Sequence, residues 1–386
     1  MKIKAIILSV ILAFGTFAFA PVNVYGAENT ELPYFYSGFT DSEKAAYESL
    51  RTAALNSEAA VTITAETPLT LESMNRIIGV LLYYDPEHFN MSGITPDAAS
   101  QTFTIAYRYD KEKYAVMKAA VDKRANEILA TAGKQRSVYN KLITIHDEII
   151  KNCRLDETAT EKSSVYGALV DGRADSFGYA EAFCLIAGKA GIRSFVNIYT
   201  KGGASFARST VYSDSFWYNI DCAKDDNSRL AANESYTYFM VPDSCYSDSS
   251  PYSAYFIQPT ANAINNYYYK ALKLEAANDI EAQNLLVKLI TENPKKNTFR
   301  FSFTDNAAFS NFVKTVTETD FITDTLDIAL RTVPVITKAA DVSFNAKTRV
   351  VTVVVYYPDT VLSAYYSDTS YFSEEQILYL KSLGIN

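Results

Sequence analysis

Histidine and tryptophan are the scarcest residues in this chain of 386 residues. There are 2 His, His88 and His146, and 1 Trp, Trp217. Histidine is the side chain that most often serves as a general base near neutral pH, because its ordinary pKa lies in that range. This shortage leaves few ways to build a catalytic dyad or triad.

Cysteine is also rare, and its spacing matches no common metal motif. The 4 cysteines, Cys153, Cys184, Cys222 and Cys245, form no C-x-x-C pair and have no histidine nearby. This spacing argues against a zinc site, and we expect neither a metal nor a cofactor. One disulfide is possible outside the cell, but the sequence does not say which cysteines would form it.

A basic run is missing as well. Lys and Arg number 36 against 44 Asp and Glu, which gives a formal charge of −8, or −10 once Lys2 and Lys4 are removed with a signal peptide. Nucleic-acid binding depends on clustered positive charge. We therefore expect no nucleic-acid partner.

The longest apolar run lies at the N-terminus, from Ala5 to Ala20. It follows two lysines and precedes Val24-Tyr25-Gly26, so residues 1–26 are predicted to be a secretion signal cleaved near Ala27. The run is shorter than the ~20 residues of a membrane span, and no later run exceeds it. We expect a secreted, extracellular protein without a membrane span; its attachment to a cell wall and its oligomeric state are left open.

The remaining chain is long enough for several domains. Removing 26 residues from 386 leaves 360, which suits two or three domains with their own cores. Capping and periodicity predict a small α+β unit at 27–132, a central domain at 133–250 and a C-terminal α+β unit at 251–386.

The first unit shows clear helix starts and strand alternation. The capping box Thr40-Asp41-Ser42-Glu43 predicts a helix to about Asn56. Further predicted elements are a strand at 61–65, a helix at 74–82 ended by Pro86, a strand at 103–109 and a long helix at 114–128. His88 follows the Asp85-Pro86 turn, and we expect it to pack or to lie at the surface rather than to catalyse.

The C-terminal unit mixes helices and strands without an identifiable motif. Predicted helices lie at 264–272, 280–292, 308–316, 324–330 and after the cap Ser373-Glu374-Glu375-Gln376; predicted strands lie at 299–303, 342–344 and 350–357.

In the central domain, a predicted helix start is followed by predicted paired strands, which is the order of elements found in a catalytic site. We expect a helix to begin near Ser176 and paired strands at 205–212 and 216–221, while His146 and Asp147 lie on an earlier helix and pack or bond locally. In enzymes of this layout, a cysteine at the helix start is activated by the helix dipole. A histidine on a neighbouring strand takes its proton, and an aspartate orients the histidine.

Several motifs follow one another in residues 135–246. They are Ile145-His146-Asp147, the run Tyr166 to Ala174, the run Gly178 to Phe183, Gly191-Ile192, the run Trp217 to Asp221, Asp225-Asp226 and the run Tyr238 to Val241. This set resembles the bacterial transglutaminase-like family, whose core is shared with papain-like cysteine peptidases. The resemblance implies an α+β fold with a transglutaminase-like/papain-like core, a helix start packed on an antiparallel sheet, flanked by small α+β N- and C-terminal regions.

The resemblance also implies a catalytic triad, two members of which are replaced. Ser176 stands where the family has cysteine and Phe206 where it has histidine, while Asp221 is kept. A serine hydroxyl needs a base more than a thiol does, and phenylalanine cannot transfer protons. Loss of one triad member typically lowers the rate by about 10⁴ to 10⁶. We therefore predict a degenerate, inactive site.

Two main functions follow. The first is a non-catalytic binding or scaffold protein of a bacterial surface, which holds a peptide, protein or cell-wall fragment in the former cleft, with Tyr179, Arg208 and Trp217 as contact residues. The second is an acyl-transfer enzyme or peptidase that uses Ser176 or another unconventional nucleophile. An assay of amine incorporation or peptide hydrolysis separates the two.

Two further functional hypotheses have less support. Tyrosine-rich segments at 252–256, 267–269 and 365–371 suggest glycan stacking, although scattered tyrosines usually serve packing. Asp225 and Asp226 do not form a carboxylate pair across one bond, because adjacent residues on a strand face opposite sides.

Overall fold

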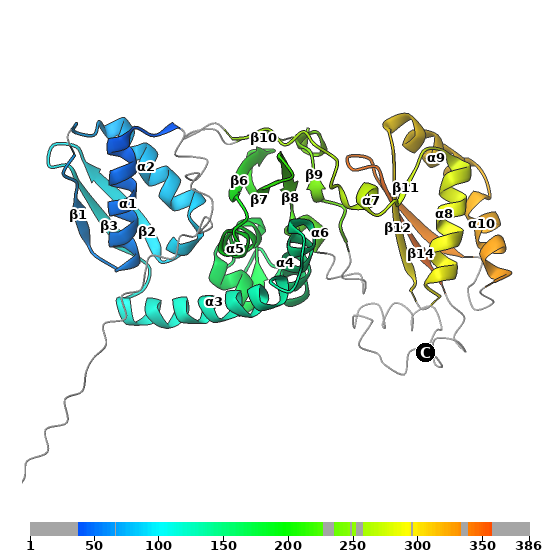
Figure 1. Cartoon of the computed structure of the whole chain (residues 1–386), viewed down its shortest axis with the longest axis horizontal. Helices are drawn as coiled ribbons and strands as arrows, with labels where there is room; N and C mark the ends of the chain where they lie inside the picture. Colours follow the sequence, from blue (N-terminus) through cyan, green and yellow to red (C-terminus); the bar gives the residue numbers. More distant parts are fainter. Residues whose placement is uncertain are drawn as a thin grey trace, which may run out of the picture.

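The computed structural model describes residues 38–65, 67–226, 235–247, 249–251, 258–294, 296–332 and 339–356, which form several sheets and helices in a mixed α+β fold. Figure 1 shows three units in a row along the chain. The predicted signal peptide and the predicted helix after Ser373 lie outside the described residues. No helix within the described ranges is both long and apolar enough to cross a bilayer.

The first unit is an antiparallel sheet packed with two helices. Strands β1 (Ala60–Thr62), β2 (Met91–Asp97) and β3 (Thr102–Tyr107) pair in the order β1-β3-β2. Helices α1 (Asp41–Leu55) and α2 (Leu71–Tyr84) bury their apolar faces in the same core. The capping box is confirmed: Thr40 Oγ1 accepts from the Glu43 N–H at 3.3 Å, and Glu43 Oε2 accepts from the Thr40 N–H at 2.8 Å.

Strand β2 was not predicted. Its sequence contains Gly93 and Pro96, two residues that weaken a strand pattern. The register shifts between Met91 and Gly93, so the strand carries a bulge. A place at the edge of the sheet tolerates both features, because the proline needs no ladder partner on its free side.

The long helix α3 (Lys111–Ala132) was predicted to belong to the first unit, which was expected to end at residue 132. Its packing places it elsewhere. Its buried stripe of Tyr114, Met117, Val121 and Ile128 lies in one core with α4 (Val138–Asn152) of the central unit. Figure 1 shows α3 running beneath the first two units. By its packing, α3 therefore belongs to the central core, and the first unit ends before it.

The central unit is an antiparallel sheet with a helix across it. Strands β6 (Ser194–Lys201), β7 (Ala204–Ser213), β8 (Phe216–Ile220), β9 (Phe239–Val241) and β10 (Ser250–Pro251) pair in the order β10-β6-β7-β8-β9. Helix α5 (Ser176–Lys189) packs on this sheet: the hydroxyl of Ser209 on β7 donates to the Ala180 carbonyl at 3.3 Å. The expected helix start and the two paired strands are confirmed.

Short elements complete the central unit. They are the 3-10 turn η4 (Asp243–Tyr246), the π-helical turn η3 (Gly167–Asp171), the parallel pair β4 (Arg154–Leu155) and β5 (Arg173–Ala174), and helix α6 (Cys222–Asp225). The 3-10 turn η2 (Pro86–His88) lies between α2 and β2 in the first unit. Because α6 includes Asp225, this residue lies on a helix and not on the strand that the sequence suggested.

The third unit is a four-stranded sheet covered by helices. Strands β11 (Glu275–Ala276), β12 (Thr298–Phe303), β13 (Ala340–Asn345) and β14 (Val350–Val355) pair in the order β11-β12-β14-β13. Helices α8 (Asp279–Glu292), α9 (Asn306–Glu318) and α10 (Phe321–Leu330) share its core. The helix predicted at 264–272 is shorter than expected, because only α7 (Tyr268–Ala271) is helical.

Candidate functional site

Ser176 is the first residue of α5, and the helix start is capped by the residue before it. Asp175 accepts hydrogen bonds from the N–H groups of Phe177 at 2.8 Å and Gly178 at 3.2 Å. These are the groups that stabilise an anion at a helix N-terminus. The carboxylate of Asp175 already satisfies them, so they are not available to an oxyanion.

Gly178 lets this helix start approach the preceding loop closely. A Cβ atom at this position would lie 2.3 Å from the Lys162 carbonyl oxygen, a distance that real Cβ atoms do not show. The same loop is tied to the cap, because the Asp175 N–H donates to the Lys162 carbonyl at 3.0 Å. The glycine of this motif is therefore required by packing.

The hydroxyl of Ser176 meets a backbone group of β7. Its Oγ accepts a hydrogen bond from the Ala207 N–H at 3.2 Å, and the residue is only 9% exposed. That N–H belongs to the peptide group joining Phe206 and Ala207, so the predicted nucleophile and base positions are neighbours. The contact is between side chain and backbone, and it offers the serine no group that could take its proton.

Phe206 turns its ring toward other aromatics. It stacks on Tyr199 with ring centroids 5.7 Å apart. Tyr199 lies on β6 directly opposite Phe206 in the sheet, which explains the stacking. The ring fills apolar space at the place where the resemblance implies a base.

Asp221 is buried and serves as a helix cap. It is 2% exposed and accepts from the Lys224 N–H at 3.1 Å and from the Tyr246 hydroxyl at 3.3 Å. Burial raises the pKa of this carboxyl, and the nearby Lys224 charge opposes the rise. These contacts give Asp221 a structural role at the start of α6.

Arg208 is the most unusual residue of the site. It is 5% exposed, and its guanidinium carbon lies 3.9 Å from the ring centroid of Tyr246 and 4.7 Å from that of Tyr199. Its Nη2 lies 3.4 Å from Asp243 Oδ1, while its buried Nε and Nη1 have no hydrogen-bond partner among the described residues. Cation–π contact with the two rings compensates part of that burial.

Tyr179 and Trp217, which were predicted to contact a ligand, lie in packed surroundings. Tyr179 is 1% exposed and its hydroxyl donates to Asp226 Oδ2 at 2.7 Å. The Trp217 ring lies 5.1 Å from Tyr212 and 5.7 Å from Phe195, measured between centroids. Contact between Tyr179 and a ligand would require the core to open.

Both histidines have partners far from Ser176 in the chain. His146 is fully buried, with Nδ1 3.1 Å from Asp147 and Nε2 3.2 Å from Asp225. Burial lowers its pKa, but hydrogen bonds to the two carboxyls outweigh burial and the net pKa is raised. His88 is buried with Nε2 3.3 Å from Asp85. Among the described residues, neither histidine hydrogen-bonds to Ser176, whose Oγ accepts from the Ala207 N–H.

The four cysteines are buried and unpaired. Burial raises the pKa of the Cys184 thiol to about 12 and that of Cys222 well above its ordinary value. A thiol becomes a nucleophile as its thiolate, which these surroundings disfavour. Among the residues that the structure describes, no three His, Cys, Asp or Glu side chains gather as metal ligands would.

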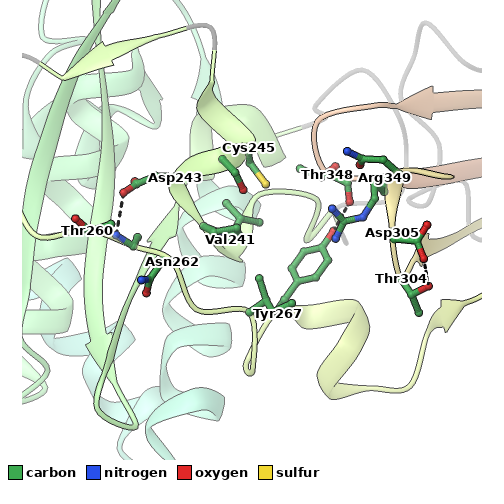
Figure 2. Close-up of a pocket in the computed structure, with 15 residues that line it drawn as sticks. Val241, Asp243, Cys245, Thr260, Asn262, Tyr267, Thr304, Asp305, Thr348 and Arg349 are labelled. Carbon is green, nitrogen blue, oxygen red and sulfur yellow. Dashed lines mark hydrogen bonds between the residues drawn. The ribbon is translucent and has the colours of Figure 1, made fainter. Parts of the chain in front are cut away.

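A second candidate site is a cavity between the central and C-terminal units, about 480 Å³ in volume. Figure 2 shows Asp243, Cys245 and Tyr267 facing Thr348 and Arg349 across it. Sequence reasoning missed this cavity, because its walls come from residues within 241–267 and 304–349, which carry no shared motif.

The comparisons with known proteins found similar structures only. No family model and no curated protein match the sequence. A Cytophaga hutchinsonii protein provisionally assigned as a cysteine protease is 14% identical, with a TM-score of 0.26, over 37% of this chain and 47% of that one. A TGase structure is 13% identical, with a TM-score of 0.25, over 44% of this chain and 56% of that one.

A third similar structure is a Parabacteroides distasonis protein provisionally assigned as a protease. It is 16% identical, with a TM-score of 0.21, over 33% of each chain. The present chain thus spans between a third and just over half of these three structures.

Proposed function

We propose that this chain is a transglutaminase-like protein without catalytic activity, which acts outside the cell as a binding module for a peptide, protein or cell-wall fragment. One observation carries the proposal: Ser176 Oγ accepts from the Ala207 N–H at 3.2 Å, and no base among the described residues hydrogen-bonds to it. A serine without a base is hardly ionised near neutral pH and is a poor nucleophile.

The helix start supports the same proposal. Acyl transfer passes through an oxyanion, which enzymes stabilise with preorganised N–H donors. Here the side chain of Asp175 accepts from the Phe177 and Gly178 N–H groups. A carboxylate at this place would also repel a developing negative charge.

The aromatic cluster beside the site supports loss of catalysis as well. Phe206, Tyr199, Arg208 and Tyr246 stack against one another, and Asp221 hydrogen-bonds at their edge. Such a cluster fixes the sheet where an active site would need space for substrate. The predicted signal at residues 1–26 supports a function outside the cell.

The test compares the mature chain from residue 27 with its Ser176→Ala variant. We measure incorporation of a labelled amine into a protein substrate and hydrolysis of a peptide library. The expected result is the same background rate for both proteins. Ser205→Ala is a matched control, because Ser205 is an exposed serine on β7, close to the same site.

A rate that disappears in Ser176→Ala but persists in Ser205→Ala would overturn the proposal and establish a serine-dependent enzyme. Circular dichroism of each variant ensures that a lost rate does not reflect unfolding.

A further inference from the structure

The start of α5 lies against the first unit. Phe177, the residue after Ser176, packs on the core that the first unit shares with the central one. The Ser176 hydroxyl accepts from the Ala207 N–H, and the Ala207 side chain is a buried member of the same core. The first unit thus covers part of the site at which the proposed function places a ligand.

The central unit contributes mostly small side chains to this shared core. Its buried members there are Ala180 and Cys184 of α5, Val196 and Ile198 of β6, and Ala207 of β7. The free energy of burial grows with apolar area, and alanine contributes little of it. Separation of the two units therefore costs less here than the opening of a core built from large side chains on both sides.

The described chain passes between the two units once, at Tyr109 and Asp110, and Figure 1 shows it leading from the first unit into α3. Tyr109 is fixed to the first unit, because its N–H donates to Asn90 Oδ1 at 2.9 Å and its carbonyl accepts from Asn90 Nδ2 at 3.1 Å. Asp110 is fixed to α3, which it caps by accepting from the Lys113 N–H at 2.8 Å. A rotation of the first unit would therefore turn about the link between these two residues.

A buried carboxylate of the central unit holds the first unit near this link. Glu161 is 5% exposed, with Oε2 3.1 Å from Arg108 Nη1 and Oε1 3.2 Å from Arg108 Nη2. The Tyr109 hydroxyl also donates to Glu161. The Phe89 ring adds an apolar contact to α3, with its centroid 5.3 Å from that of Tyr114.

A second carboxylate, Glu87 of η2, forms ion pairs within the first unit and across to the central one. Its Oε2 lies 2.5 Å from Arg51 Nη2 in the first unit. Its Oε1 lies 3.9 Å from Lys118 Nζ on α3 and 3.9 Å from Lys189 Nζ on α5. Ion pairs as long and as partly exposed as the two across the joint each contribute little, so they hold the units together without locking them.

These contacts join a single hinge, a face of small side chains and a few ion pairs in one joint. We infer that the first unit is a hinged cover of the central unit, which turns about Tyr109 and Asp110 and is held closed by the ion pairs of Glu161 and Glu87. Opening uncovers the start of α5 and the adjoining face of β6 and β7, which lets a peptide, protein or cell-wall fragment reach the site around Ser176. The inference rests on the proposed binding function, to which it adds the control of access.

Two thiols report the opening in the full mature chain. Cys184 lies under the cover, and burial raises the pKa of its thiol to about 12, so it reacts slowly with iodoacetamide while the cover is closed. The substitution Ser176→Cys places a second thiol at the helix start itself. When opening and closing are fast compared with labelling, the labelling rate is proportional to the fraction of open molecules. Mass spectrometry measures the rate at each site.

Glu161→Gln and Lys189→Met remove charges on the central side of the joint and leave the interior of the first unit unchanged. Both thiols should be labelled at least about tenfold faster in Glu161→Gln, because loss of one partner of a buried ion pair is strongly destabilising. The rise should be about two- to fivefold in Lys189→Met, whose ion pair with Glu87 is longer. Arg124→Met is the matched control, since Arg124 pairs with Glu148 at 3.4 Å within the central unit, and it should leave both rates unchanged.

Hydrogen exchange separates a turning cover from an unfolding one. The Ile105 N–H bonds to the Ala59 carbonyl at 2.8 Å within the first unit, so this amide should stay protected in Glu161→Gln while the thiols become reactive. Loss of its protection in step with labelling overturns the inference, as do unchanged thiol rates in Glu161→Gln. A Cys184 rate that rises while the thiol of Ser176→Cys stays slow overturns it too. A Ser176-dependent reaction would instead overturn the lack of catalysis and leave the cover in place.

Discussion

At the scale of single residues, the motif around Ser176 can be compared position by position with what packing requires. Position 178 requires glycine because the Lys162 carbonyl lies close to it, and the Tyr179 hydroxyl is engaged by its hydrogen bond to Asp226. Ser176 and Phe206 make contacts that hold structure but cannot move a proton. These contacts agree with the proposal of a binding module without catalysis.

Gly178→Ala should destabilise the protein strongly. The added Cβ would lie 2.3 Å from a backbone oxygen, so the helix start or the loop has to shift. We expect the free energy of unfolding to fall by about 3 kcal/mol, as in overpacked cores. Urea unfolding measures it, and Gly93→Ala is the control, with nothing within 4 Å of its Cβ. Equal losses in both variants would argue against the steric account.

Placing cysteine at position 176 and histidine at position 206 should not be sufficient for amine incorporation. In the double variant Ser176→Cys/Phe206→His, Asp175 still accepts from the Phe177 and Gly178 N–H groups. The oxyanion donors stay occupied, and loss of one such donor alone typically costs about 10² to 10³ in rate. We expect no amine incorporation above the background of the unmodified chain. Readily measured turnover would show that Asp175 gives up its cap during catalysis.

At the scale of helices and strands, the buried pair of His146 and Asp225 joins α4 to α6. Their side chains are 3.2 Å apart, and the Tyr238 N–H also donates to Asp225 at 2.9 Å. The His146 ring stacks on Tyr236 with centroids 5.1 Å apart. This network fixes the end of β8 and the segment that follows it.

The pair should make stability depend on pH. Despite burial, the carboxyls of Asp147 and Asp225 hold the pKa of His146 above its ordinary 6.5. A histidine with a raised folded pKa contributes stability that is complete below the unfolded pKa and is lost as pH rises through the folded pKa. The stability gap between the unmodified chain and His146→Gln should therefore narrow from about pH 6 to pH 8. Urea unfolding at several pH values measures this gap, and a gap that widens with pH would contradict the assignment.

Elements with strong local signals were predictable, and those set by distant contacts were not. The capping box at Thr40 and the helix start at Ser176 follow from nearby residues. The edge strand β2 lacks an alternating pattern, and the packing of α3 depends on helices that come later in the chain. The burial of Arg208 depends likewise on Tyr199 and Tyr246, which no local motif connects to it.

At the scale of the whole molecule, the outer units cover opposite parts of the central one. Ala180, Cys184 and Ile198 of the central unit share a core with Met74 and Ile77 of the first unit. On the other side, Cys245 and Tyr246 pack with Tyr267 and Val350 at the C-terminal unit. The central sheet is thus buried by its neighbours as well as by its own helices.

The four buried cysteines can report which unit covers which surface. All are unpaired, and burial raises the pKa of Cys153 to about 12 and that of Cys245 to about 11, so the intact chain should react slowly with a thiol reagent at pH 8. Cys184 lies in the core shared with the first unit, and Cys245 in the core shared with the C-terminal unit. The labelling rate of each of these two cysteines therefore reports whether its interface is covered.

Deleting residues 27–109 should expose Cys184, and ending the chain at residue 266 should expose Cys245. In each shortened chain we expect rapid labelling of that cysteine alone, because Cys153 and Cys222 lie in the central core with α4 and α5. Mass spectrometry after brief labelling identifies the modified residue. Labelling of all four cysteines in a shortened chain would mean that the central unit has unfolded, and that its core depends on the removed unit for more than cover.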